Sequence, residues 1–374
     1  MSKYFEEFNF GEVFVTRGRT LTEADIMQYA GLCWDTQAEH TNAEFAKQGP
    51  FGKRIGQQQL GLLIAHGLVQ SLRLTEGTLV SVLRLGWNFF NPMKIGDTLH
   101  VKQTILEKKD VAMEGAGLIA FQMETINQKD ELVNRCTRTT LVARQPNAGK
   151  EIKPKYVFMG LSELEATTSE LRAPDSGPPT ASQRSESPQP RGSQRAEQLG
   201  QAVSQKRGKY FEEFELGEEL VTQARTVAEA DTVNYTILSW DTDALHTDVV
   251  YGQSASFGGT LAPLLLPIIF ANGLGATLGF LAGTNRGALG DWWEFVSPVR
   301  TGDTLHFRQV IAAKRDAQDS DTGIVTFGME MINERGDVVS RGQRTALVAR
   351  RPRSEGEAVP WNFVFGTSEE LAKK

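Results

Sequence analysis

Hydrophobic and polar positions follow two different patterns along the first part of the chain. From Gln59 to Leu74 most positions are apolar and charges are few, which predicts a long helix enclosed on most sides. Upstream, Thr22 precedes acidic residues and marks the start of a shorter helix. The runs after the long helix read as strands between Gly- and Pro-containing turns, and they span Thr78–Phe90, Asp97–Lys108, Leu118–Asn127 and Glu131–Ala143. One long helix against a mostly antiparallel sheet is an α+β arrangement.

The same pattern occurs twice. "KYFEEF" at Lys3 recurs at Lys209, and "IGDTLH" at Ile95 recurs as "TGDTLH" at Thr301, so the interval is 206 residues in both cases (209 − 3 and 301 − 95). We therefore expect two domains, residues 1–165 and 208–374, which we call copy one and copy two.

The segment between the copies, residues 166–207, has a different composition. It is rich in Pro, Ser, Gln and Gly and almost free of large apolar residues. Such a segment cannot bury enough surface to offset the entropy of ordering it, so we expect a flexible linker, with one short helix near Gln194–Ala202.

One charge-free stretch, Leu261 to Gly283, is long enough to span a bilayer. The matching stretch of copy one contains Arg73 and Glu76, and two prolines interrupt the stretch itself. We therefore expect a buried helix and no membrane association.

Composition narrows the possible partners and location. The net charge of −6 gives no basic surface of the kind that binds nucleic acid. Cys33 and Cys136 are matched in copy two by Ser239 and Gly342, so no disulfide framework is expected and a cytoplasmic location fits. The five histidines show no metal-ligand spacing, and we expect no metal site.

The candidate chemistry lies in "WDTQAEHTN", from Trp34, and "WDTDALHTD", from Trp240. Each contains an Asp, four further residues and a His, which are Asp35 with His40 and Asp241 with His246. An Asp and a His on one short loop can hold a single water molecule, which suits general acid–base catalysis. The spacing is common by chance, but its repetition in the same setting makes both pairs candidate catalytic residues.

The order of elements, together with "YAGLCWDTQAEHTNAEFA", resembles the MaoC-like dehydratases, also called R-specific enoyl-CoA hydratases. The resemblance implies a double hotdog fold, in which the two copies pack as a pseudo-dimer within the chain and further homo-oligomers can form. It also implies reversible addition of water to an enoyl-CoA thioester by the two Asp/His pairs. Coenzyme A would be part of the substrate, with no separate cofactor.

The resemblance also indicates where substrate would bind. In this family a backbone N–H at the start of the long helix holds the thioester oxygen, and that position falls in "IGQQ" at Ile55 and in "LAPL" at Leu261. The chain has Trp where the family usually has Gly before the Asp, which would reshape the pocket. The "IAHG" at Ile64 resembles the family's turn but falls inside the helix, where a polar side chain could still contact substrate. The candidate substrate-binding residues are Trp34, Gln57, Gln58, His66, Trp240, Leu264 and Asn272.

Two other functions stay open from the residues alone. A hotdog thioesterase would want a carboxylate on the long helix, and neither Gln59–Leu74 nor Pro263–Gly279 has one. A non-catalytic scaffold is disfavoured because both Asp/His pairs are present. Because the two motifs share their flanking Trp and Thr residues, we expect two competent sites with different acyl preferences.

Overall fold

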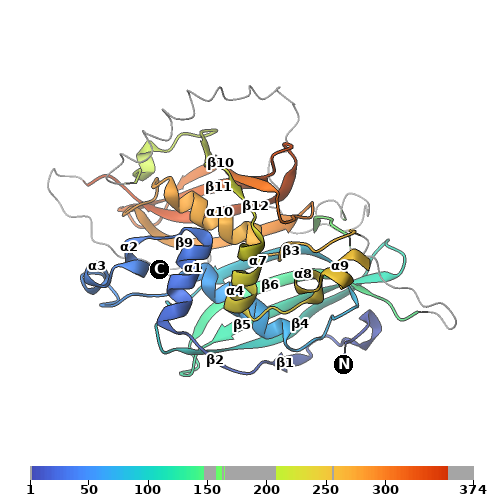
Figure 1. Cartoon of the computed structure of the whole chain (residues 1–374). Coiled ribbons are helices and arrows are strands. Elements are labelled where there is room, and N and C mark those ends of the chain that lie inside the picture. The colour runs from blue at the N-terminus through green and yellow to red at the C-terminus, as the bar shows by residue number, and fades with distance from the viewer. Residues whose placement is uncertain (1, 147–156, 162–163, 165–207, 255–256, 353–374) are drawn as a thin grey trace.

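The structure is a computed structural model that describes residues 2–146, 157–161, 164, 208–254 and 257–352 (Figure 1). The linker expected at 166–207, with its helix near Gln194–Ala202, lies outside the described residues, so its limits stay a prediction.

Copy one follows the order expected from its sequence. Its elements are η1 (Phe5–Glu7), β1 (Val13–Val15), β2 (Arg19–Thr20), α1 (Glu23–Cys33), α2 (Ala38–Thr41), α3 (Ala43–Lys47), α4 (Gln58–Gln70), β3 (Leu79–Phe89), β4 (Thr98–Asp110), β5 (Ala116–Ile126) and β6 (Leu132–Ala143). The long helix α4 ends four residues earlier than predicted, because the chain turns after Ser71 and Arg73 has a positive φ of 53°.

Copy two repeats this order. Its elements are η2 (Phe211–Glu213), β7 (Glu219–Val221), β8 (Arg225–Thr226), α7 (Glu229–Ser239), α8 (Ala244–Thr247), α9 (Val249–Ser254), α10 (Leu266–Thr277), β9 (Asn285–Phe295), β10 (Thr304–Asp316), β11 (Thr322–Ile332) and β12 (Val338–Ala349). The long helix α10 begins at Leu266 rather than at Pro263, and Pro267 occupies its first turn, where the missing N–H costs nothing.

The strands of both copies form one antiparallel sheet. Its order is β1-β4-β5-β6-β3-β9-β12-β11-β10-β7, and β3 pairs with β9 at the junction of the copies. Leu85 lies opposite Trp293, and Trp87 lies opposite Asp291. The pseudo-dimer within one chain is thereby confirmed, because neither copy leaves its β3-type edge unpaired.

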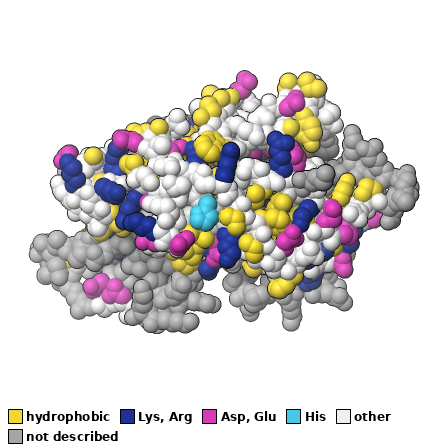
Figure 2. All heavy atoms as spheres, turned by 90° about the horizontal axis from the view of Figure 1, so that it is seen from below, with side chains coloured by type: hydrophobic (Ala, Val, Ile, Leu, Met, Phe, Trp, Pro, Cys, Tyr) yellow, Lys and Arg dark blue, Asp and Glu magenta, His cyan; other side chains and the backbone are white. Residues whose placement is uncertain are grey.

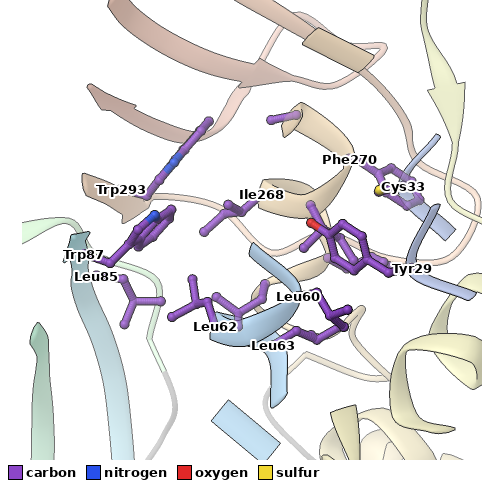
Figure 3. Packing of buried hydrophobic residues seen from close by; sticks show 14 of the residues in the cluster. Tyr29, Cys33, Leu60, Leu62, Leu63, Leu85, Trp87, Ile268, Phe270 and Trp293 are labelled. Carbon is purple, nitrogen blue, oxygen red and sulfur yellow. The ribbon is translucent and has the colours of Figure 1, made fainter. Parts of the chain in front are cut away.

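The long helices α4 and α10 and the shorter α1 and α7 lie together against the inner face of this sheet (Figure 1). A single cluster of buried apolar residues extends through both copies. In Figure 3, Leu62 of α4 lies near Leu85 of β3, and Ile268 of α10 lies beside the rings of Trp87 and Trp293. Trp87 and Trp293 are thus core residues, and both are buried.

Glycines allow helices of different copies to come into backbone contact. A Cβ placed on Gly67 of α4 would lie 1.9 Å from the carbonyl oxygen of Ser239, at the end of α7. A Cβ on Gly273 of α10 would lie 1.6 Å from the carbonyl oxygen of Cys33, at the end of α1. Only glycine permits these two approaches, and each brings the middle of one long helix beside the Asp/His loop of the other copy.

The surface carries charges of both signs. On the face seen in Figure 2, Lys and Arg side chains lie among Asp and Glu side chains and hydrophobic ones, without a continuous basic area. Over the described ranges, no helix is both long enough and apolar enough to cross a membrane. The charge-free stretch that begins at Leu261 contributes α10, whose residues are largely buried in the shared core.

Candidate active sites

The two Asp/His segments adopt the same local structure, in which each His lies in a short helix, α2 or α8, and not in the loop expected from the sequence. Each Asp follows a Trp that ends the preceding helix in the left-handed conformation, with φ of 73° at Trp34 and 68° at Trp240. Glycine favours this conformation, which explains why the family usually has Gly at the position. A bulky residue here is strained, so the surrounding contacts must hold it.

An arginine from the opposite copy supplies those contacts. Arg225 donates to the carbonyl oxygen of Leu32 in α1 at 2.5 Å, and its guanidinium lies 4.4 Å from the ring centre of Trp34. In the reverse direction, Arg19 donates to the carbonyl oxygen of Leu238 in α7 and stacks on Trp240 at 4.3 Å. A cation at a helix C-terminus and above an indole ring is stabilising in both respects.

These arginines are themselves held by carboxylates, since Arg19 pairs with Asp25 and Arg225 pairs with Asp231, each at 2.5 Å.

Trp34 and Trp240, which were candidate substrate-binding residues, line neither of the two pockets described below. Trp34 and Trp240 are 37% and 40% exposed, and the ring of each lies against an arginine of the opposite copy.

The histidine of each Asp/His pair is oriented by a backbone carbonyl. His40 Nδ1 lies 3.0 Å from the oxygen of Ile55, and His246 Nδ1 lies 2.9 Å from the oxygen of Leu261. If Nδ1 carries the proton and donates it to the carbonyl, Nε2 is left as an unprotonated atom for the pocket.

The first pocket combines the loop of copy one with the helix and sheet of copy two. It has a volume of about 160 Å³, and Asp35, His40 and Gln58 line it together with Asn272 of α10. Its far wall consists of copy-two residues, which include Asp291, Gln309 and Arg344.

Asp35 is almost buried and receives three amide donors, of which one is the backbone N–H of Gln37, at 3.4 Å from Oδ1. Gln37 Nε2 donates to its Oδ1 at 3.0 Å, and Asn272 Nδ2 donates to its Oδ2 at 3.1 Å. Two carboxylate oxygens offer about four lone pairs, so acceptor capacity remains for a water molecule in the pocket.

The second pocket is the reciprocal one and is larger, at about 720 Å³. His246 and Leu264 of copy two line it, together with His66, Leu79 and Val82 of copy one. Its wall is therefore more apolar near the sheet than the wall of the first pocket.

Asp241 does not line this second pocket. It is 1% exposed, and His66 Nε2 lies 3.5 Å from its Oδ2, so the imidazole of copy one stands between the carboxylate and the cavity. Burial alone would raise the pKa of Asp241, but contacts with His66, the charge of His246 and the backbone N–H of Asp243 outweigh it and lower the pKa.

The predicted substrate-binding residues separate into two groups. Gln58 and Asn272 line the first pocket, while His66 and Leu264 line the second. Gln57 lines neither, because its fully buried side chain points into the core and its Nε2 donates to the oxygen of Ile26 at 3.4 Å. The "IAHG" segment is inside the helix, as expected, and His66 reaches the loop of the other copy.

Sequence reasoning assigned no role in the site to Asp291 or to Arg344. In the structure Arg344 pairs with Asp291, at 3.0 Å from Nε and 2.9 Å from Nη2 to the same oxygen, Oδ2. Burial raises the pKa of Asp291, and Arg344 offsets part of that rise. The available signal was a charged residue at a strand position where copy one has Leu85.

Comparison with known proteins identifies the family. A model of the MaoC-like domain matches the chain twice, at residues 7–124 and 212–331. The chain belongs to the MaoC-like domain family. The (R)-specific enoyl-CoA hydratase of Rhodospirillum rubrum is 30% identical over 123 residues, 31% of this chain and 82% of the hydratase. The β-methylmalyl-CoA dehydratase of Chloroflexus aurantiacus is 30% identical over 148 residues, 38% of this chain.

This MaoC-like chain is 34% identical to the protein MaoC of Klebsiella aerogenes over 28% of its own length, which covers 31% of that protein. It covers 41% of the length of the β-methylmalyl-CoA dehydratase. Solved structures match nearly the whole chain. A MaoC domain protein of Chloroflexus aurantiacus has a TM-score of 0.70 at 20% identity, covering 94% of this chain and 98% of its own. A Mycobacterium tuberculosis protein with a double hotdog fold has a TM-score of 0.65 at 19% identity, covering 93% and 98%. The double hotdog fold is therefore confirmed.

Proposed function

We propose that this MaoC-like chain catalyses the reversible addition of water to the double bond of an enoyl-CoA thioester. The observation that carries the proposal is that Asp35, His40 and the start of α4 at Gln58 all border one cavity. Two relatives, at 30% identity, have the names of an enoyl-CoA hydratase and an acyl-CoA dehydratase, which supports the same reaction class.

In the first pocket a water molecule would lie between the Asp35 carboxylate and His40 Nε2. One group takes a proton from the water as its oxygen bonds to Cβ, and a proton is delivered to Cα, so that the acid–base pair is restored after each turnover. Asn272 and Gln37 would hold the carboxylate in place through their two side-chain amide contacts.

The negative charge that develops on the thioester oxygen needs a donor. The helix α4 begins at Gln58, and Gln57 provides no side-chain cap for it. The first N–H groups of a helix have no partner within the helix and lie at its positive end, so the N–H of Gln58 suits this role. In the second pocket the aligned position is Leu264, which lines the cavity but lies two residues before α10 begins at Leu266, so any donor there would be a turn N–H.

We propose that the second pair, Asp241 and His246, acts on a bulkier and more apolar acyl group. Its cavity is more than four times the volume of the first. The expectation of two competent sites with different acyl preferences stays a prediction.

A thioesterase is disfavoured by the same residues that disfavoured it in the sequence. Neither α4 nor α10 contains an acidic side chain that could activate water from the long helix. An activity measurement distinguishes the hydratase from the alternative of a non-catalytic scaffold.

The test uses the purified full-length chain with but-2-enoyl-CoA, following loss of the enoyl-thioester absorbance and the mass of a product that has gained one water. We expect hydration, and we expect Asp35→Asn and His40→Ala to lower it about 100- to 10,000-fold, as removal of a general acid or base does. Glu44→Gln, which removes only an exposed ion pair with Lys47, is the control. Absence of hydration across a panel of enoyl-CoA esters would leave the scaffold as the better interpretation.

A further inference from the structure

The wall of the first pocket differs from its counterpart in copy one in a way that points to a ligand. At the end formed by the sheet, copy two has Asp291 where copy one has Leu85, and both copies have an arginine at the partner position, Arg138 or Arg344. The carboxylate is therefore an addition to an arrangement that copy one forms with an apolar side chain.

Asp291 uses only half of its hydrogen-bonding capacity within the protein. Its Oδ2 accepts both bonds from Arg344, while its Oδ1 has no hydrogen-bond partner among the described residues. The Asp291 side chain is 1% exposed, yet the residue borders the cavity, together with Gln309 and Arg344. A buried charged oxygen without a partner is costly, so a donor from a bound molecule would be favourable here.

The ion pair also restricts what that donor can be. Asp291 and Arg344 together are neutral, and a carboxylate on the ligand would meet the negatively charged oxygen of Asp291 as well as the guanidinium. A hydroxyl can donate to Oδ1 and accept from a guanidinium at the same time. A methyl group in the same place would leave Oδ1 unpaired. Sites with an unpaired buried polar group discriminate strongly against ligands that lack the matching polar group.

We propose that the first pocket selects a short acyl thioester that carries a hydroxyl group at its far end, bound by Asp291 and Arg344. The proposal rests on the proposed function, since it assumes that the thioester end lies between Asp35, His40 and Gln58. The cavity of about 160 Å³ is below the roughly 300–1,000 Å³ of sites for drug-sized ligands, which suits a short acyl group better than a long one.

The test is calorimetric binding to the full-length chain, which does not depend on turnover. The probes are 3-hydroxybutanoyl-CoA, 3,4-dihydroxybutanoyl-CoA and the monothioester of a short dicarboxylic acid, so the far end is a methyl, a hydroxyl or a carboxylate. We expect the hydroxyl compound to bind about tenfold to a hundredfold more tightly than the methyl compound, in line with a hydrogen bond to a charged group.

Asp291→Leu creates in copy two the Leu and Arg combination that copy one already has, and it should abolish the preference. Asp291→Asn keeps the shape and a neutral acceptor, and it should reduce the preference to a few-fold, which keeps the test valid if the leucine variant does not fold. Tighter binding of the carboxylate, equal binding of the first two compounds, or a hydroxyl preference that survives both substitutions would overturn the proposal. Tight hydroxyl-selective binding without any hydration would instead contradict the proposed function alone.

Discussion

At the scale of single residues, the two Asp/His pairs differ through one side chain contributed by the other copy. Asn272 donates a hydrogen bond to Asp35, whereas His66, at the equivalent position, stands between Asp241 and its pocket. Asn272 and His66 are matched positions at the 206-residue interval, so the first pocket has an amide where the second has an imidazole. This exchange changes both the access to the carboxylate and its charge environment, and the Gln37 amide that also donates to Asp35 is replaced by Asp243 in copy two.

Replacing His66 with Asn should therefore raise the pKa of Asp241. Burial alone raises that pKa above the ordinary value of 3.8, and His66 provides the largest contribution that lowers it. Carboxyl carbon NMR of the full-length chain, titrated from neutral to acidic pH, measures the change. In the wild type Asp241 should stay ionised down to pH values below 3.8, whereas in His66→Asn it should take up its proton at a higher pH.

Asn272→Ala is the matched control for that titration, because it removes the partner of Asp35 and leaves the surroundings of Asp241 intact. An unchanged or lower Asp241 pKa in His66→Asn would show that the imidazole does not stabilise the carboxylate.

The sequence contained the residues of the first pocket but not their grouping. Asp35, His40 and the start of α4 lie in one copy, so motif spacing and helix prediction could relate them. The contact of Asn272 with Asp35 and the position of Asp291 depend on how two copies 206 residues apart in sequence pack, and no local periodicity carries that information. For the same reason Trp34 looked like a pocket residue, although its partner is Arg225 of the other copy.

At the scale of elements, the two longer helices and the four long strands of a copy were predictable to within a few residues, because alternation, apolar runs and turn residues are local signals. The short helices α2 and α3 carry no such pattern, and α2 falls where the sequence predicted a loop. What the periodicity could not show is the crossing of α4 with α7 and of α10 with α1. Gly67 and Gly273 make these crossings possible, and each follows directly after the residue that reaches the opposite loop, His66 or Asn272. The "HG" and "NG" pairs thus join a contact residue to a close-approach residue.

Gly67→Ala and Gly273→Ala should each destabilise the chain, by about 1–3 kcal/mol or more, because the added methyl group overlaps a backbone carbonyl oxygen that cannot move without its helix. Gly31→Ala is the control: it also lies in a helix, α1, but its Cβ would meet nothing within 4 Å, so it should be neutral or stabilising by up to about 1 kcal/mol. Urea unfolding of the three variants gives the comparison. Equal stability of Gly67→Ala and Gly31→Ala would contradict the close crossing.

At the scale of the whole molecule, the two copies are one structure. The sheet continues from β3 to β9, the apolar core extends through both halves, and Arg19 and Arg225 each stabilise a helix of the other copy. Each pocket consequently takes residues of an Asp/His segment from one copy and its opposite wall from the other. Duplication within one chain allows these two pockets to differ, which identical subunits of a symmetric dimer could not do.

The measurement that tests this arrangement most directly is turnover by two double variants on one panel of enoyl-CoA esters, from short to bulky. The variants are Asp35→Asn/His40→Ala and Asp241→Asn/His246→Ala. We expect the first to lose hydration of short esters by at least about 100-fold and the second to retain it, because Asp35 borders its pocket and Asp241 is covered. Loss of short-ester hydration in the second variant, with full activity in the first, would contradict the assignment of the reaction to the first pocket.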